Sequence, residues 1–301
     1  MAAEGAVSAP DVPPGAAVLD PPVLDAHAHV WRPSALPYPW LDDVPALRRD
    51  VAPSDIDDAG GRIREWVFVE ADADPRAAID EVAWVSALDW PGLRAIVAHA
   101  DLVDDALERH LDALAAFPLV RGVRHPLQDA PADVLASARF ASGLRRVGER
   151  GLAFDACVRW WQLDALADAV AQAPGTPVVL DHVGKPPLAE GLDGPEGERW
   201  REGLGRLAAL PHVSVKLSGL AAEAPTPAVF DALGPETLRI AFAAFGADRS
   251  MFGGDWPVSG PPGTGVPIAA ALDHVRAAVP AQAHGAVLGG TARRFYGLAT
   301  P

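Results

Sequence analysis

The chain of 301 residues contains a single cysteine, Cys157. One cysteine excludes an intramolecular disulfide, so the fold cannot depend on covalent cross-links. The lack of disulfides is typical of proteins that work in a reducing compartment, and we therefore expect a cytoplasmic protein. Half of the residues are hydrophobic, and a chain of this length can bury a substantial apolar core in place of cross-links.

Basic residues are also scarce. The chain has 25 Lys and Arg against 40 Asp and Glu, and its formal net charge is -15. A surface that neutralises nucleic acid phosphates or an anionic membrane needs clustered positive charge. The composition therefore argues against nucleic acid and membrane partners and favours a small-molecule substrate. It is compatible with a monomer or with a homo-oligomer.

Long hydrophobic runs are absent as well. No apolar run approaches the roughly 18 to 20 residues that a membrane-spanning helix requires. Residues 1–21 have neither a basic n-region nor a continuous apolar h-region, so they do not read as a secretory signal. We expect residues 1–21 to form a flexible lead and residues 22–301 to form a single catalytic domain.

What the sequence does contain is an alternation of short apolar runs with longer segments of helical spacing. The eight runs lie at residues 23–29, 66–71, 93–100, 119–125, 152–158, 177–182, 212–218 and 250–255. Parallel strands need a crossover, usually a helix, so this alternation predicts a (β/α)8 or TIM barrel of the α/β class. An open doubly wound sheet is the alternative, disfavoured because no Gly-rich dinucleotide turn follows an early run.

Two histidines end the first run, VLDAHAHVW. His27 and His29 are two residues apart, so their side chains are expected on one face of the strand, with Asp25 below them. Active sites of barrels form at the C-terminal ends of the strands. Two imidazoles at this spacing can converge there on one ion.

Other runs end in similar chemistry. His182 ends the sixth run, Asp255 the eighth and Glu70 the second. These residues predict one divalent ion, with zinc preferred, held by His27, His29, His182 and Asp255, and with Glu70 as a further candidate ligand. The structural alternatives are a backbone-bonded histidine at position 182 and an Asx turn at position 255.

Two basic residues are candidates for substrate binding. Arg124 ends the fourth run, and its forked donors suit a carbonyl or carboxylate group of a substrate, although a salt bridge to a rim carboxylate is an equal alternative. Lys216 lies on the inward register of the seventh run. It is expected either to bind a substrate oxygen or to form a buried pair with Asp or Glu.

Tryptophans are frequent at the predicted rim. The candidates for substrate binding are Trp40, Trp160, Trp161 and Trp256, whose flat faces can stack on a ring-shaped ligand. Trp40 belongs to a long loop between Val30 and Ser54, and long ordered loops usually cover sites. For any one of these residues, plain packing is the alternative.

A series of motifs resembles one enzyme superfamily in order and approximate spacing. YPWL, VFVEAD, VRGVRHPLQ, VVLDHVGKP, VKLSGL, MFGGDWPVS and ARRFYGL are similar to the lactone-hydrolase branch of the amidohydrolases, and the match covers residues 23–298. By this resemblance His27 and His29 match the first-strand histidines, and His182 the sixth-strand histidine. Asp255 matches the aspartate that activates water.

The chain departs from the superfamily pattern in two places. Binuclear members need a lysine on the fourth strand and a histidine on the fifth, whereas this chain has Arg124 and His125 on the fourth and no histidine in FDACVRWW. One ion is therefore expected rather than two, and a mechanism without metal stays open because the branch includes such a member. Trp160 and Trp161 replace a polar stretch of sugar lactonases, which predicts a less hydroxylated lactone.

The resemblance implies a hydrolase that opens a lactone. Asp255 would act as general base, His182 would position the water or bind the ion, and Arg124 would polarise the carbonyl group. Glu70 and Lys216 would contact the substrate. The alternatives are a metal-dependent decarboxylase of the same superfamily, acting on an aromatic or unsaturated acid, and a non-catalytic barrel that binds carbohydrate.

Overall fold

The computed structural model describes residues 22–260 and 263–299, so the predicted lead at 1–21 lies outside the described residues. Eight parallel strands form one sheet in sequence order, each hydrogen-bonded to the next, which confirms the predicted (β/α)8 barrel. The strands are Val23–Ala28 (β1), Ile63–Val69 (β2), Leu93–His99 (β3), Val120–Pro126 (β4), Ala153–Cys157 (β5), Val178–Leu180 (β6), Val213–Leu217 (β7) and Ser250–Phe252 (β8).

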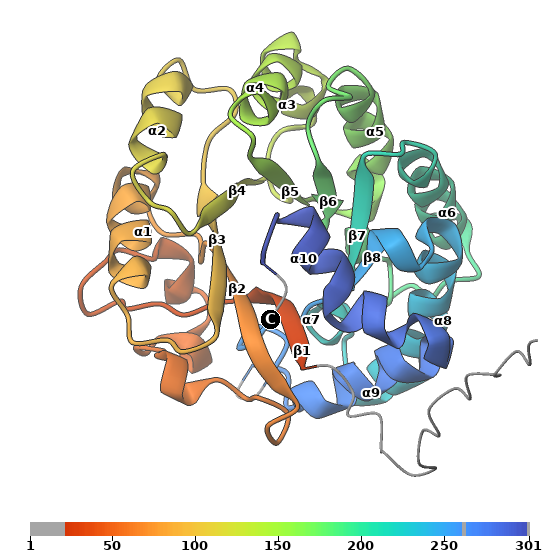
Figure 1. The fold of residues 1–301 in the computed structure, drawn as a ribbon. Helices are drawn as coiled ribbons and strands as arrows, with labels where there is room; N and C mark the ends of the chain where they lie inside the picture. The colour runs from red at the N-terminus through yellow and green to blue at the C-terminus, as the bar shows by residue number, and fades with distance from the viewer. Residues whose placement is uncertain (1–21, 261–262, 300–301) are drawn as a thin grey trace, which may run out of the picture.

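Helices lie around this barrel, and the last one lies across one end of it, as Figure 1 shows. They are Ala78–Ser86 (α1), Leu107–Leu114 (α2), Ala132–Ala136 (α3), Ala138–Glu149 (α4), Leu163–Ala171 (α5), Pro195–Ala208 (α6), Leu220–Glu223 (α7), Pro227–Phe245 (α8), Ile268–Ala278 (α9) and Thr291–Phe295 (α10). Their apolar faces pack on the outside of the strands and form the main hydrophobic core. In the part of the chain that the structure describes, no helix is both long and apolar enough to cross a membrane.

The barrel closes between its first and last strands, just beyond the end of β8. The backbone N–H of His29 donates to the carbonyl of Trp256 at 2.9 Å, and the N–H of Asp255 donates to the carbonyl of His27 at 2.7 Å. A parallel bridge joins Ala28 to Trp256. This seam places the polar ends of β1 and β8 next to each other at the C-terminal rim.

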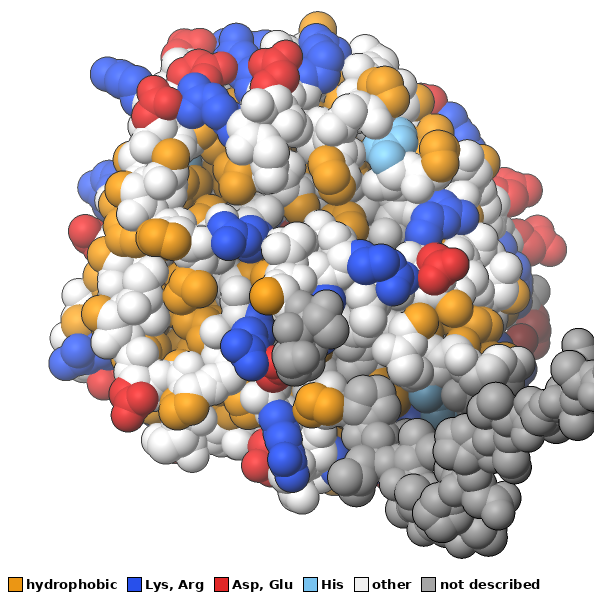
Figure 2. Space-filling view, viewed as in Figure 1, with side chains coloured by type: hydrophobic (Ala, Val, Ile, Leu, Met, Phe, Trp, Pro, Cys, Tyr) orange, Lys and Arg blue, Asp and Glu red, His pale blue; other side chains and the backbone are white. Residues whose placement is uncertain are grey.

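Helix α10 covers the opposite end of the barrel and lies across its centre in Figure 1. A smaller apolar cluster joins strand residues such as Val67 and Val97 to Ala292 and Tyr296 of this C-terminal segment. On this face, acidic and basic side chains are interspersed and do not gather in one basic patch (Figure 2). The functional site therefore has to be sought at the other end, where the strands finish.

Candidate active site

His27 in β1 and His29 directly after this strand lie together, as their spacing predicts. Nε2 of His27 is 3.1 Å from Nε2 of His29, and both residues are buried. Nδ1 of His29 lies 2.8 Å from the carbonyl of Val69 on β2. Because a carbonyl only accepts, this contact places the His29 proton on Nδ1 and leaves a lone pair on Nε2.

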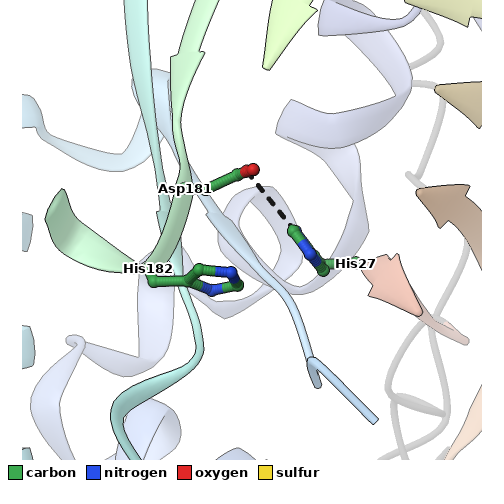
Figure 3. A group of neighbouring side chains, drawn as sticks. All are labelled: His27, Asp181 and His182. Carbon is green, nitrogen blue, oxygen red and sulfur yellow. Dashed lines mark ion pairs between the residues drawn. The ribbon is translucent and has the colours of Figure 1, made fainter. Parts of the chain in front are cut away.

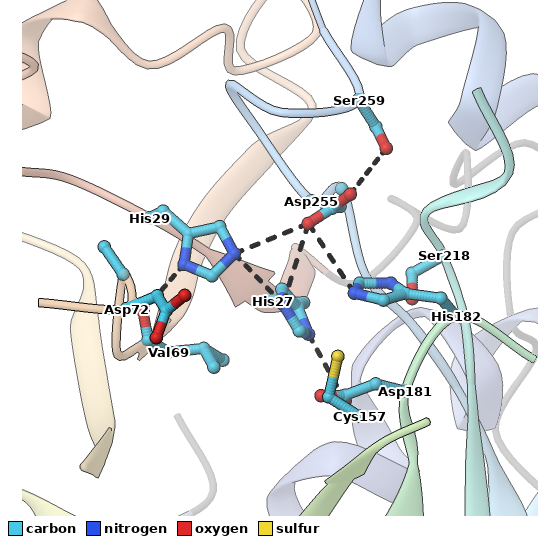
Figure 4. A network of polar contacts seen from close by, with 12 residues as sticks. His27, His29, Val69, Asp72, Cys157, Asp181, His182, Ser218, Asp255 and Ser259 are labelled. Atoms are coloured by element: carbon cyan, nitrogen blue, oxygen red, sulfur yellow. Dashed lines mark hydrogen bonds and ion pairs between the residues drawn. The ribbon is translucent and has the colours of Figure 1, made fainter. Parts of the chain in front are cut away.

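His182 and Asp255 complete the group from two loops. His182 follows β6 with φ of 53°, Asp255 follows β8 with φ of 54°, and both are in the left-handed region. Oδ1 of Asp255 lies 3.4 Å from Nε2 of His29, 3.7 Å from that of His27 and 3.8 Å from that of His182. Figure 4 shows this carboxylate between the three rings. Asp255 is thus the centre of the cluster.

Neighbouring residues fix the orientation of these groups. The hydroxyl of Ser259 donates to Oδ2 of Asp255 at 2.5 Å, which turns Oδ1 toward the imidazoles. Nδ1 of His182 lies 3.0 Å from the hydroxyl of Ser218. Gly219, with φ of 72°, permits this approach, because a Cβ there would lie 2.3 Å from Nδ1 of His182.

The pKa values of the cluster favour an ionised Asp255 beside neutral His27 and His182. Burial lowers the pKa of His182 to about 4, and burial followed by the charge of Lys216 lowers the pKa of His27 well below its usual value. Burial alone would raise the pKa of Asp255, but the imidazoles, His182 foremost, hold it well below the usual range. At neutral pH the cluster therefore presents one carboxylate and nitrogen lone pairs.

This donor set suits a divalent ion. Ligands at about 2.0 to 2.1 Å from a tetrahedral ion lie about 3.3 Å apart, and the separations given above scatter around that value. Two overlapping groups have suitable atoms close together, one of His27, His29 and Asp255 and the other of His27, His182 and Asp181 (Figure 3). Sequence reasoning did not single out Asp181, although it directly precedes His182.

Glu70 pairs with Arg124 and does not belong to the histidine cluster. Its Oε1 accepts from Nε of Arg124 at 2.5 Å, its carbonyl accepts from the second Arg124 nitrogen at 2.6 Å, and its Oε2 accepts from the N–H of Asp72 at 2.8 Å. Burial would raise the pKa of Glu70, but Arg124 outweighs it and lowers the value. Glu70 belongs to neither group of metal-ligating atoms in the described residues. The geometry shows it orienting Arg124 and the Asp72 turn.

A cavity of about 220 Å³ opens onto the cluster. Its lining is His29, Trp31, Trp40, Ala71, Asp72, Arg124, Pro126, Gln128, Asp129, Cys157, His182, Lys185, Asp255 and Val258. Trp40 is fixed by a hydrogen bond from its Nε1 to the carbonyl of Ala71 at 2.8 Å. Asp72 is presented from a turn with φ of 55°. The cavity thus combines aromatic faces with hydrogen-bond acceptors next to Asp255.

The other three predicted tryptophans are placed differently. Trp256 is buried, and Trp160 and Trp161 are not part of the cavity lining in the described residues. Trp161 is exposed, and the guanidinium groups of Arg159 and Arg199 lie over the rings of Trp161 and Trp160. The expectation of a less hydroxylated lactone was drawn from Trp160 and Trp161, and among the described residues neither lines this cavity.

Lys216 lies beneath the histidines, with none of its surface exposed. Its Nζ donates to Oδ2 of Asp155 at 2.5 Å and lies 3.0 Å from Oδ1 of Asp181, as in the buried-pair alternative. Burial raises the pKa of Asp155 to about 6 against the opposing effect of Lys216. Sequence reasoning missed Asp155, although an aspartate in the apolar run LAFDACV was a signal for it.

Comparison with known proteins places the chain in a family. Residues 24–298 match the family described as amidohydrolase. The chain belongs to the amidohydrolase family. Among its amidohydrolase relatives, the L-fucono-1,5-lactonase of Burkholderia multivorans is 36% identical over 299 residues, which are 92% of this chain and 97% of that protein. The L-fucono-1,5-lactonase of Burkholderia ambifaria is 33% identical over 245 residues, 78% of this chain and 80% of that protein.

A solved amidohydrolase structure is also similar. The amidohydrolase of Burkholderia multivorans with bound zinc superposes with a TM-score of 0.79 at 32% identity, covering 92% of this chain and 99% of that one. The resemblance noted in the sequence is thereby confirmed at the level of the family and of the fold.

Proposed function

We propose that this amidohydrolase opens a lactone ring by attack of water, with Asp255 as general base. The observation that carries the proposal is one ionised carboxylate, surrounded by three imidazoles, in the wall of a cavity. The similarity to two lactonases supports the choice of ester hydrolysis over decarboxylation.

Asp255 would take the proton of the attacking water through Oδ1, the oxygen that faces the imidazoles. Ser259 occupies Oδ2 and keeps the carboxylate in this orientation. A divalent ion held by Asp255 and the three histidines, zinc in our proposal, would lower the pKa of a bound water toward about 7 and would polarise the carbonyl group.

His27, His29, His182 and Asp255 are the residues that we propose to hold the ion. Imidazole nitrogen and carboxylate oxygen are common ligands of zinc, and the relative with bound zinc supports this choice. Arg124 would bind the carbonyl oxygen of the lactone, because it lines the cavity and Glu70 fixes its plane.

We propose a neutral, hydroxylated sugar lactone as the substrate. Both cations in the cavity lining are already paired, Arg124 with Glu70 and Lys185 with Glu223 at 2.9 Å, so little positive charge is left for an anionic substrate. Asp72 and Gln128 offer acceptors for hydroxyl groups, and Trp40 offers a flat face for the C–H side of a sugar ring.

A panel of lactones tests the proposal. Acid release is measured with metal-depleted protein and with protein loaded with zinc or manganese, beside carbon dioxide release from aromatic acids. We expect hydrolysis of sugar lactones by the loaded protein only. Carbon dioxide release without lactone hydrolysis would replace the proposal by the decarboxylase alternative, and sugar binding without turnover would favour a binding protein.

Three further expectations remain proposals of the same kind. We propose that residues 22–301 form one catalytic domain, whereas the predicted lead at residues 1–21 lies outside the described residues. We also propose a cytoplasmic protein, which the single, buried, free Cys157 supports. We propose a homo-oligomer as the third expectation, and size-exclusion chromatography with light scattering tests it by measuring the molar mass.

A further inference from the structure

A ladder of buried polar groups runs from Tyr296, directly after α10, to the histidine cluster. The hydroxyl of Tyr296 donates to Oδ2 of Asp155 at 2.7 Å, and Nζ of Lys216 donates to the same oxygen at 2.5 Å. The same Nζ donates to Nδ1 of His27 at 3.2 Å and lies 3.0 Å from Oδ1 of Asp181. At most 2% of the surface of any of these five residues is exposed.

The contact between Lys216 and His27 fixes the position of one proton. A neutral imidazole has one ring proton, and an ammonium group can only donate. Nδ1 of His27 must therefore accept, and its proton lies on Nε2. From there it can be donated to Nε2 of His29, whose own proton points to the carbonyl of Val69. In this arrangement Nε2 of His27 has no lone pair for an ion.

Asp181 is placed to accept a hydrogen bond from His27 if the proton of His27 lies on Nδ1 instead of Nε2. It forms an ion pair with Lys216, whose Nζ lies 3.0 Å from Oδ1, but neither of its buried carboxylate oxygens has a partner of good hydrogen-bond geometry. Its Oδ1 also lies 3.4 Å from Nδ1 of His27, an ion pair drawn as a dashed line in Figure 3. A buried acceptor is stabilised by a well-aligned donor. A proton on Nδ1 would give Oδ1 such a donor beside the ammonium group of Lys216, and it would free the lone pair of Nε2.

We propose that Asp181 is a positioning residue that switches His27 between two tautomers. In the metal-free protein, Nδ1 accepts from Lys216 and Nε2 carries the proton. When His27 serves as a ligand, the same proton lies on Nδ1 and is donated to Oδ1 of Asp181, so the number of protons is unchanged. Carboxylates that accept from the second nitrogen of a ligating histidine orient many metal sites. The inference rests on the proposed metal site, and it assigns a role to a residue outside the cavity.

Nitrogen NMR of the wild-type protein tests the switch directly. Protein labelled with 15N-histidine is compared without metal and with zinc, and a His27→Gln spectrum assigns the His27 signals. We expect the proton on Nε2 without metal and on Nδ1 with zinc. The same tautomer in both spectra, or no zinc binding, would overturn the inference.

Zinc affinity gives a second readout, measured by competition with a chelator. Asp181→Asn should weaken zinc binding by about 10-fold or more, the usual effect of removing such a carboxylate. Glu65→Gln is the matched control, since Glu65 is an equally buried carboxylate that pairs with Arg94 away from the cluster. It should leave zinc affinity unchanged, and equal affinities in the two variants would contradict the role of Asp181.

The two readouts separate this inference from the proposed function. Neither measurement uses turnover, so a protein that shows the switch but hydrolyses no lactone would refute only the proposed function. If Asp181→Asn does not fold, the wild-type spectra decide the question alone.

Discussion

Charged side chains occupy both the rim of the barrel and its interior, but the two regions differ in whether these side chains also reach the cavity. At the rim, Arg124 and Asp255 each have a fixed partner and still line the cavity. In the interior, Lys216 and Asp155 have no exposed surface, and their partners are other protein groups. Depth therefore decides whether a charge is available to a ligand or serves to position its neighbours.

The difference has an energetic reason. A buried ion pair gains little over an apolar pair of the same shape, but removing one partner leaves an uncompensated charge in a medium of low dielectric constant. The interior should therefore respond to mutation mainly in stability, and the rim mainly in catalysis.

The largest effect is expected at the rim. Asp255→Asn keeps the shape of the side chain but removes the proton acceptor, so kcat for lactone hydrolysis should fall by at least about 100-fold. The melting temperature should stay near that of the wild type, since the hydroxyl of Ser259 can still donate to an amide oxygen. Substantial residual turnover would remove Asp255 from the role of base.

Lys216→Met tests the interior. It leaves Asp155 and Asp181 without their shared cation, and the free energy of unfolding should drop by about 3 to 5 kcal/mol. Urea denaturation measures this change. Tyr296→Phe, which removes only one hydroxyl from the same ladder, should cost about 1 kcal/mol. Similar losses in the two variants would show that the cation is not the main contribution.

A buried carboxyl group on a helix outside the barrel predicts a pH dependence of stability. Burial raises the pKa of Glu81 on α1 from 4.5 to about 8. Between these values the folded protein keeps a proton that the unfolded chain releases, so the contribution of Glu81 to stability falls as pH rises. At about 1.4 kcal/mol per pKa unit, Glu81→Gln should gain up to a few kcal/mol over the wild type between pH 5 and 8.

The control for this experiment is Glu149→Gln, at an exposed position on α4. Its stability should follow that of the wild type across the same pH range. A Glu81→Gln curve parallel to the wild-type curve would mean that Glu81 is not protonated in the folded protein at neutral pH.

The smallest effect is expected for a rim residue whose side chain we propose to contact the substrate. Asp72→Ala removes an acceptor from the cavity, and KM for a hydroxylated lactone should rise by about 10-fold with kcat little changed. A lactone without hydroxyl groups serves as the control and should show no difference. An equal rise for both lactones would indicate a general disturbance of the cavity.

The sequence predicts the barrel well because the alternation of apolar runs with helical segments can be read from residues that are close together in the chain. The pairing of His27 with His29 follows from the period of two along a strand. The positions of His182 and Asp255 do not, since β6 ends at Leu180 and β8 at Phe252, before either residue. Both residues lie in loops with a left-handed backbone, which strand alternation cannot anticipate.

The ladder below the cluster was not predictable in this way. Tyr296 and Asp155 are separated by 141 positions, and only the closed barrel brings them together. The tryptophans show the same limit: Trp40, Trp160 and Trp161 are all near the rim, but only Trp40 among them lines the cavity. Residue type predicts chemistry, whereas the direction of a side chain depends on tertiary packing.

The seam between β1 and β8 has a consequence for the dynamics of the whole molecule. The barrel is held shut there by backbone bonds of His29 and Asp255, the same residues whose side chains face the cavity. A ligand held by those side chains would clamp the first strand to the last. Binding should therefore slow amide hydrogen exchange throughout the strands, and not only in the loops around the cavity, because opening the sheet would first require release of the ligand.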